Sequence, residues 1–460
     1  MAKKISYFNL SERIIFLRII DLCILISSLY LASSFINFNY INFKSGAILN
    51  WLLLLVFYYL IFGQIFQIYN LNVSNNKYLI VKATVLTAFA TTIFYVFTPY
   101  FSPELPTNRL QIVYFFLLTF IPILLWRFVY MTVIFSPKYF KSVVFVGSSE
   151  RIRKLLTQIH HDSFHNVSAY LSECKIDGVN GFKDISKTKI SSIVSDNHIT
   201  EVIVSKRDLT SDVVEAINKE LILLFEQGVN IISYETFYES VNARIPREYL
   251  DYNFYRYINF SKNNSNNFYL FGLRLVDILI SFVGIFMFFV FVPIIIIGNI
   301  FANRGPLFYT QLRVGENGKH FKIFKLRSMI KNAEVGGAVW AKKNDTRITS
   351  FGKFLRRTRL DEMPQFINII KGDMSLIGPR PERPEFVKDL EDKIPFYAIR
   401  HVIRPGLTGW AQVNYPYANT IEEQETKLRY DLYYIKERSA FLDFKIFIKT
   451  FTTVLYFKGQ

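Results

Sequence analysis

The sequence predicts a membrane protein of mixed class, α plus α/β, and three observations support this prediction. Four long apolar runs fill the first third, short strands then alternate with helices, and a fifth apolar run precedes a basic C-terminal part. We expect a four-helix transmembrane bundle over residues 1–140, a small Rossmann-like βαβ domain over 141–260, a re-entrant membrane helix over 268–300, and a mainly α C-terminal domain over 301–460.

Composition narrows the class of partner. The chain has 460 residues, of which 51% are hydrophobic and 17% aromatic, and its net charge is +17. A basic excess suits nucleic acid, an anionic membrane surface or phosphate-bearing substrates. The apolar residues are clustered and the sequence contains no recognisable nucleic-acid-binding module, so we expect a lipid bilayer and no nucleic acid as partner. Cys23 and Cys174 provide neither a disulfide framework nor a zinc spacing, which fits a reducing compartment.

Each of the first four apolar runs is near the ~20 residues that cross a bilayer as a helix. They cover Ile14–Ile36, Ile48–Tyr69, Leu79–Tyr100 and Leu110–Phe135. Lysines gather before the first run, between the second and third, and after the fourth, so the positive-inside rule puts both ends in the cytoplasm. Arg18, Asp21 and Arg127 lie inside or near these runs, where snorkelling or mutual pairing explains a charge without any chemistry.

A βαβ pattern follows the fourth run. We expect strands at Ser142–Val146, Glu201–Ser205 and Val229–Ser233, and helices at Glu150–His160 and Asp212–Gln227. A dinucleotide fingerprint would follow the first strand, but only Gly147 of its glycines is present. We therefore expect a structural or regulatory domain that binds no NAD(H) tightly. His160, His161 and His165 are interpreted as solvated residues, because no carboxylate or cysteine completes a metal set.

The fifth apolar run, Phe268–Ile300, follows a linker rich in Asn and Ser, Ser261–Asn267. A full crossing would place the basic C-terminal part outside, against the positive-inside rule. A kinked helix that enters and leaves on one face removes this conflict. Pro293 lacks the N–H of a helical hydrogen bond and is our predicted membrane kink.

The most informative segment is Arg356–Gln365, in which three arginines precede the adjacent carboxylates Asp361 and Glu362. Apolar residues at helical spacing follow, and Gly372 is a candidate stop, so we expect both carboxylates in the first turn of one helix. A helix N-terminus attracts anions and nearby arginines can neutralise a diphosphate. The alternative is that the carboxylates cap the helix and the arginines are ordinary ion-pair partners.

Other blocks in the last third are basic or rich in glycine and proline. They are Phe308–Gly315, Phe321–Met329, Lys371–Glu382 and Arg400–Asn414. The second alternates apolar and basic residues, as the edge of a binding face does. The last two resemble loops, in which glycine and proline let backbone approach a ligand and arginines suit oxyanions.

Three motifs carry a resemblance to a known family: Leu-Asp-Glu-x-Pro-Gln at 360–365, Gly-Asp-Met-Ser-Leu-Ile-Gly-Pro-Arg-Pro at 372–381, and Arg-Pro-Gly-x-Thr-Gly-Trp-Ala-Gln-Val-Asn at 404–414. Residues 268–460 resemble the bacterial sugar transferase family, the monotopic phosphoglycosyl transferases. The whole layout is similar to its large, exopolysaccharide-initiating members, the undecaprenyl-phosphate hexose-1-phosphate transferases. The resemblance implies that the C-terminal domain is catalytic.

The resemblance implies transfer of a sugar 1-phosphate from a UDP-sugar to a polyprenyl phosphate, usually undecaprenyl phosphate, with release of UMP. It implies that Asp361 is the nucleophile of an aspartyl-phosphosugar intermediate and that Asp361 and Glu362 hold Mg²⁺ or Mn²⁺. Five candidates for phosphate contacts follow, the first two preferred: Arg356, Arg380, Lys325, Arg327 and Arg404.

The same resemblance extends to the fifth apolar run. Arg274 and Asp277 match residues of the family's re-entrant helix, whose break is a Ser-Pro pair, whereas this chain has Val292-Pro293. The implied location is the bacterial inner membrane with the catalytic domain facing the cytoplasm, and a homodimer is possible for the large subgroup.

Two other functions compete with this one. A non-catalytic membrane-anchored scaffold or sensor of polysaccharide export would need no Asp361-Glu362 pair inside a complete motif set. A membrane-bound nucleotide-sugar oxidoreductase would need the glycines missing after Gly147. The sequence therefore favours phosphoglycosyl transfer, without naming the sugar.

Overall fold

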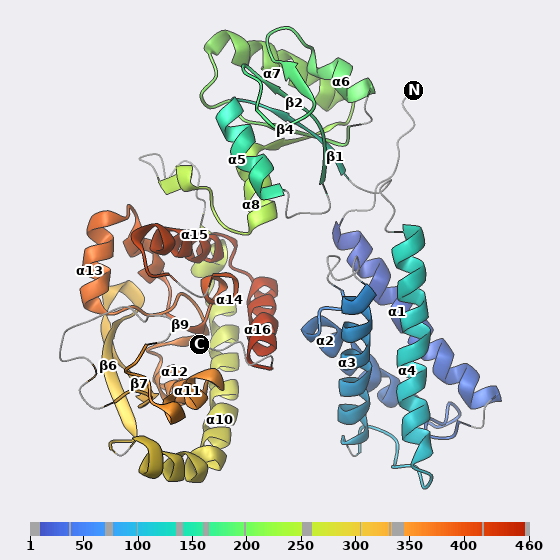
Figure 1. Cartoon of the computed structure of the whole chain (residues 1–460). Helices are drawn as coiled ribbons and strands as arrows, with labels where there is room; N and C mark the ends of the chain where they lie inside the picture. The colour runs from blue at the N-terminus through green and yellow to red at the C-terminus, as the bar shows by residue number, and fades with distance from the viewer. Residues whose placement is uncertain are drawn as a thin grey trace. The chain divides into compact units, whose positions relative to one another are not determined.

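The computed structural model forms two compact units, Met1–Tyr234 and Glu235–Gln460, which are described one at a time (Figure 1). It describes residues 10–35, 38–69, 77–98, 100–134, 141–159, 165–196, 199–250, 260–303, 305–330, 333, 345–415 and 418–455.

The four apolar runs of the first unit are helices, as predicted. They are α1 (Leu10–Phe35), α2 (Ile48–Ile65), α3 (Lys77–Val96) and α4 (Leu110–Val129), the last continued by η2 (Tyr130–Ile134). Helix α1 packs on α4, α2 on α3, and α3 on α4. All four are long and apolar enough to cross a membrane. Helix α2 ends before the predicted Tyr69, because the chain turns there with Gln67 in a left-handed conformation at φ 61°.

Charged side chains inside these helices have partners within the bundle, as Asp21, Arg127 and Arg18 show. Asp21 of α1 and Arg127 of α4 form a buried ion pair. Arg18 donates to Gln64 Oε1 over 2.8 Å, and both arginines lie over the ring of Tyr69. A buried charge is tolerated when an opposite charge lies beside it. Of the two explanations given for Asp21 and Arg127, mutual pairing is therefore confirmed.

The rest of the first unit is a parallel α/β domain. Its elements are β1 (Lys141–Val146), α5 (Ser149–Ile159), β2 (His165–Ser172), β3 (Phe182–Asp184), α6 (Ile190–Asp196), β4 (Glu201–Val204), α7 (Ser211–Glu226) and β5 (Asn230–Ser233). The sheet order is β3-β2-β1-β4-β5 and every pairing is parallel. The predicted βαβ pattern is confirmed, and β2, β3 and α6 are additions. His165 lies in β2, while His160 and His161 lie outside the described residues.

Contacts within the domain lie close to Gly147, where a dinucleotide fingerprint would be expected. A Cβ at Gly147 would lie 2.9 Å from Ser205, so β1 and β4 are in close contact there. Arg151 donates to Ser205 Oγ and to Asp208 Oδ2, both over 3.1 Å, and is 4% exposed. This arrangement supports the expectation of no tight NAD(H) binding, which stays a prediction.

The second unit surrounds one large core. Helix α8 (Tyr234–Asn242) leads into it, and its other helices are α10 (Asn267–Gly298), α11 (Ser350–Arg357), α12 (Gln365–Lys371), α13 (Pro384–Lys393), α14 (Trp410–Asn414), α15 (Ile421–Glu437) and α16 (Ala440–Leu455). Short turns of 3-10 or π helix are η4 (Arg247–Leu250), η5 (Lys262–Asn264), η6 (Asn299–Asn303), η7 (Glu316–Gly318), η8 (Leu360–Glu362) and η9 (Tyr397–Val402). Strands β6 (Phe308–Val314) and β7 (His320–Leu326) pair antiparallel, and β8 (Ser375–Ile377) and β9 (Gly406–Thr408) pair parallel.

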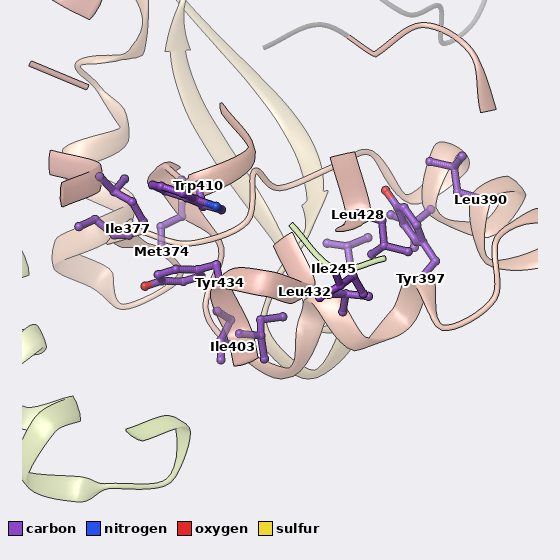
Figure 2. Packing of buried hydrophobic residues seen from close by; sticks show 14 of the residues in the cluster. Ile245, Met374, Ile377, Leu390, Tyr397, Ile403, Trp410, Leu428, Leu432 and Tyr434 are labelled. Atoms are coloured by element: carbon purple, nitrogen blue, oxygen red, sulfur yellow. The ribbon is translucent and has the colours of Figure 1, made fainter. Parts of the chain in front are cut away.

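The core joins segments that are far apart in the sequence. Figure 2 shows Ile245 from the start of the unit beside Leu428 and Leu432 of α15, with Trp410 and Met374 in the same cluster. Trp410 Nε1 donates to the carbonyl of Ala243 over 2.7 Å. Burying such side chains stabilises by about 2 kcal/mol each. The segment around Ile245 therefore packs with the C-terminal core.

Helix α10 packs against the rest of this unit through one stripe of buried side chains. Its buried residues are Asp277, Ser281, Gly284, Phe288 and Ile295, at helical spacing. Asp277 Oδ1 accepts from Ser375 Oγ at 3.1 Å and Leu376 N at 2.9 Å, and Arg274 donates to the carbonyls of Ile369 at 2.5 Å and Ile370 at 2.6 Å. Both residues that matched the family's helix therefore anchor α10 to α12 and β8. The helix continues through Pro293.

Candidate active site

The carboxylate pair lies in a tight turn between two helices. Helix α11 ends before Arg359, which is left-handed at φ 60°, and Asp361 and Glu362 follow in the 3-10 turn η8. The expected single helix is therefore wrong, because α12 begins only at Gln365. Pro364 has no N–H for the carbonyl of Leu360, which instead accepts from Met363 N at 3.3 Å. The predicted stop is confirmed by Gly372 at φ 91°.

Three cations from separate segments surround Glu362. Its Oε1 accepts from Arg380 Nη2 at 2.7 Å and lies 3.5 Å from Lys325 Nζ, and its Oε2 lies 3.4 Å from Arg359 Nη1. Lys325 comes from β7 and Arg380 from the loop after β8. Glu362 is 8% exposed. The site therefore holds a buried carboxylate whose two oxygens are both engaged by positive charge.

Asp361 is as buried as Glu362, but its side chain is engaged differently. It is 8% exposed, and its Oδ1 has no hydrogen-bond partner among the residues that the structure describes. Burial and then the neighbouring Glu362 carboxylate raise the pKa of Asp361, against the charges of Lys325, Arg356 and Arg359. A carboxylate oxygen with a free lone pair is what nucleophilic attack or metal binding needs.

Burial and the surrounding charges also shift the pKa values of Glu362 and Lys325. Burial by itself would raise the pKa of Glu362, but Arg380, Lys325 and Arg359 outweigh it and hold that pKa well below its usual range. Burial lowers the pKa of Lys325 to about 8, although Glu362 opposes the shift. The positive surplus around the pair suits a ligand with several negative charges.

The other three candidates for phosphate contacts have hydrogen-bond or ion-pair partners outside the carboxylate pair. Arg356 donates through Nε to Ser328 Oγ over 2.9 Å, and its charge acts on Asp361. Arg327 is 8% exposed and donates to the carbonyl of Asn303 over 2.9 Å. Arg404 instead pairs with Glu316 at 3.2 Å on the surface. The structure thus joins Lys325 and Arg380 directly to the carboxylate pair, brings Arg356 near it, and gives Arg327 and Arg404 other partners.

Sequence reasoning did not place Arg359 at the site, although it named the arginine cluster. The spacing of Arg359 and Glu362 is i, i+3, which brings side chains together on one turn, and could have indicated the pair.

Asp361 Oδ1 is available to a divalent cation that is shared with a substrate, whereas both oxygens of Glu362 already face cations. Among the described residues no group of three or more His, Cys, Asp or Glu side chains could hold a metal by itself. Magnesium in phosphate-handling sites is commonly bound by one or two carboxylates, with phosphate oxygens and water as further ligands. Asp361 Oδ1, which has no partner among the described residues, could supply one such carboxylate ligand.

The fold and site define a membrane-associated protein with a buried carboxylate pair that is surrounded by basic side chains. Residues 268–457 match the family described as Bacterial sugar transferase. Over 132 residues the chain is 48% identical to a putative undecaprenyl-phosphate N-acetylgalactosaminyl 1-phosphate transferase of Bacillus subtilis, and the match covers 29% of this chain and 74% of that protein. The chain belongs to the bacterial sugar transferase family.

Two longer relatives match smaller shares of their own length. A UDP-N-acetylgalactosamine-undecaprenyl-phosphate N-acetylgalactosaminephosphotransferase of Aeromonas hydrophila is 48% identical over 33% of this chain and 36% of its own length. A UDP-glucose:undecaprenyl-phosphate glucose-1-phosphate transferase of Xanthomonas campestris is 39% identical over 41% of this chain and 40% of its own length. The match thus spans well under half of these two relatives, in keeping with the resemblance drawn from the motifs.

Proposed function

We propose that this protein transfers a sugar 1-phosphate from a UDP-sugar to undecaprenyl phosphate, which gives undecaprenyl-diphosphate sugar and UMP and begins the assembly of a glycan. The observation that carries the proposal is the buried Oδ1 of Asp361, which has no partner among the described residues, beside a carboxylate that three cations hold ionised. The names of the relatives, which act on undecaprenyl phosphate, agree with it.

The chemistry runs in two displacements on phosphorus. Asp361 Oδ1 attacks the β-phosphorus of the UDP-sugar, the bond to the bridging oxygen breaks, and UMP leaves with that oxygen. An oxygen of undecaprenyl phosphate then attacks the same phosphorus, and the acyl-phosphate bond to Asp361 breaks to restore the carboxylate. Two displacements split one difficult step into two easier ones.

The surrounding side chains bind and neutralise phosphate oxygens. Arg380, Lys325 and Arg359 lie around the pair and supply positive charge where charge builds up on the transferring group. The positive charge of Arg356 acts on Asp361. Arg327 and Arg404 remain weaker candidates, because Arg327 binds the Asn303 carbonyl and Arg404 pairs with Glu316.

Asp361 and Glu362 would hold Mg²⁺ or Mn²⁺ when the nucleotide is bound. The cation would neutralise diphosphate oxygens and make phosphorus a better electrophile. Its charge would also favour the ionised form of Asp361, whose pKa burial and Glu362 raise.

The packing of α10 supports a re-entrant helix, while the lysine distribution and the family resemblance favour a catalytic domain on the cytoplasmic face of the bacterial inner membrane. Tyr269, near one end of α10, donates to Asp443 of α16, and a Cβ at Gly298, at the other end, would collide with Phe351 of α11. A helix held by one domain at both ends cannot put those ends on opposite sides of a bilayer unless the domain also crosses. Its outer face is apolar and exposed, as at Phe271 and Phe289. The family resemblance further favours a homodimer.

Cysteine labelling of intact cells tests this topology. In a background with Cys23 and Cys174 replaced, a cysteine at Lys44 should react with a membrane-impermeant reagent from the periplasm, because Lys44 follows α1. A cysteine at Lys319, after α10 and β6, should react only after the membrane is opened. Periplasmic labelling at both positions would exclude the re-entrant arrangement.

Release of UMP tests the function itself. The full chain in a detergent micelle or nanodisc is given undecaprenyl phosphate, Mg²⁺ and one UDP-sugar at a time. At least one sugar should give UMP and an equal amount of lipid-linked sugar phosphate. A scaffold or sensor predicts neither product with any UDP-sugar, and that result would refute the proposal.

A further inference from the structure

The loop that carries Arg380 is held by its carbonyl groups. Four consecutive carbonyls, those of residues 379–382, each accept a hydrogen bond from a different donor. The donors are Gly406 N to Pro379 O at 2.9 Å, Arg400 Nη2 to Arg380 O at 2.9 Å, Arg313 Nη1 to Pro381 O at 3.0 Å and Val314 N to Glu382 O at 2.9 Å. Pro379 and Pro381 have no N–H, so this loop depends on its carbonyls to fix its path.

The two arginines that anchor this loop are oriented by other side chains, and Arg400 is buried. Arg400 is 2% exposed, and it also donates to Asp431 Oδ2 over 2.9 Å and to the Tyr397 hydroxyl over 2.6 Å. Arg313 is oriented by Gln311, whose Oε1 accepts from its Nη2 at 2.6 Å. Planar guanidinium groups with several fixed donors suit such simultaneous contacts better than an ammonium group does.

The backbone of Arg380 links these anchors to the carboxylate pair. Arg380 precedes a proline, which restricts its backbone to extended conformations and so fixes the direction of its Cα–Cβ bond relative to its carbonyl. The carbonyl binds Arg400, and the guanidinium lies 2.7 Å from Glu362. Misplacing a catalytic group by about 1 Å can cost up to about 100-fold in rate.

We propose that Arg400 and Arg313 are positioning residues, which bind the carbonyls of Arg380 and Pro381 and thereby aim the Arg380 guanidinium at Glu362 and at the phosphate groups bound there. An effect of these arginines on the reaction rate rests on the sugar 1-phosphate transfer proposed above. Among the described residues, neither arginine forms a hydrogen bond or ion pair with the carboxylate pair, so each would act on Arg380 through the carbonyls of the loop.

A double-mutant cycle tests the link between Arg400 and Arg380 in the full chain. Arg400→Lys keeps a charge opposite Asp431, so the buried carboxylate is not left unpaired. It should lower kcat/KM by about 10-fold to 100-fold. If Arg400 acts through Arg380, the double variant Arg400→Lys, Arg380→Gln should be no worse than Arg380→Gln within about twofold, because coupled residues are not additive. Losses that multiply would overturn the proposal.

Hydrogen exchange gives a measurement that needs no activity. Arg400→Lys should speed amide exchange in a peptide covering residues 378–383 and leave α12 unchanged. Arg313→Lys should do the same and serves if Arg400→Lys does not fold. Arg429→Lys is the matched control, because Arg429 is a buried arginine that binds the carbonyl of Ile245 at 2.7 Å, away from this loop. Unchanged exchange of the loop in both test variants would refute the positioning role.

The two proposals fail in different ways. A wild-type chain that releases no UMP would refute the proposed function, while the exchange measurement would still decide whether the two arginines hold the loop. A wild-type chain that does release UMP, with multiplying losses and an unchanged loop, would refute the positioning role alone.

Discussion

Asp361→Asn is expected to abolish turnover, by at least about 10⁴-fold, and to leave the fold intact. The amide is nearly isosteric with the carboxylate, and the Oδ1 that it alters has no partner among the described residues. An amide oxygen is a far poorer nucleophile than a carboxylate oxygen. Removing a buried negative charge whose pKa is already raised should also cost little stability.

The covalent adduct distinguishes this mechanism from direct displacement. A UDP-sugar labelled in its β-phosphate is incubated with the protein without lipid acceptor. Peptide analysis should find a phosphosugar on Asp361 together with an equal amount of UMP. Asp389→Asn is the matched control, since Asp389 lies on the surface of α13, paired with Lys393 at 2.6 Å, and should keep full activity. UMP that appears only with acceptor, together with retained activity in Asp361→Asn, would establish direct displacement instead.

Glu362→Gln is expected to lower kcat by about 10²–10³-fold without preventing the adduct on Asp361. The amide cannot balance Lys325, Arg359 and Arg380, which then repel one another, and it binds a divalent cation weakly. The melting temperature in detergent should therefore fall, since a buried charge cluster has lost its central anion. Glu391→Gln, on the exposed side of α13, should change neither quantity.

Both limbs of the pH profile of kcat/KM should move to lower pH in Glu362→Gln. Glu362 raises the pKa of Lys325 against burial, which lowers it to about 8. Without that carboxylate the ammonium group loses its proton at lower pH, so the alkaline fall of kcat/KM should move below about pH 8. Glu362 also raises the pKa of Asp361, so the acid limb should move down as well. A variant with normal kcat and an unshifted profile would show that Glu362 is not part of the charge network of the reaction.

Much of the fold follows from local pattern. The four N-terminal apolar runs became α1 to α4, the strand before Gly147 became β1 in a parallel sheet, and the stop at Gly372 is a left-handed glycine. These features depend on hydrophobic periodicity and on residues with restricted or permissive backbones, all within one stretch of chain. The turn η8 was missed because periodicity does not show where a helix begins: the chain closes a 3-10 turn at Leu360–Glu362, and α12 starts only after Pro364.

What the sequence by itself determined is the family, the carboxylate pair and a supply of basic residues on either side of it. Only the tertiary structure decided which of these cations meet Glu362, because Lys325 and Arg380 lie 37 and 18 residues away and reach it through the packing of β7 and of the loop after β8. The same packing places Arg404 in an ion pair with Glu316. It also lets Arg400 and Arg313 donate hydrogen bonds to the carbonyls of the Arg380 loop. Local sequence carries no information on such distances, since they depend on how whole segments settle against a shared core.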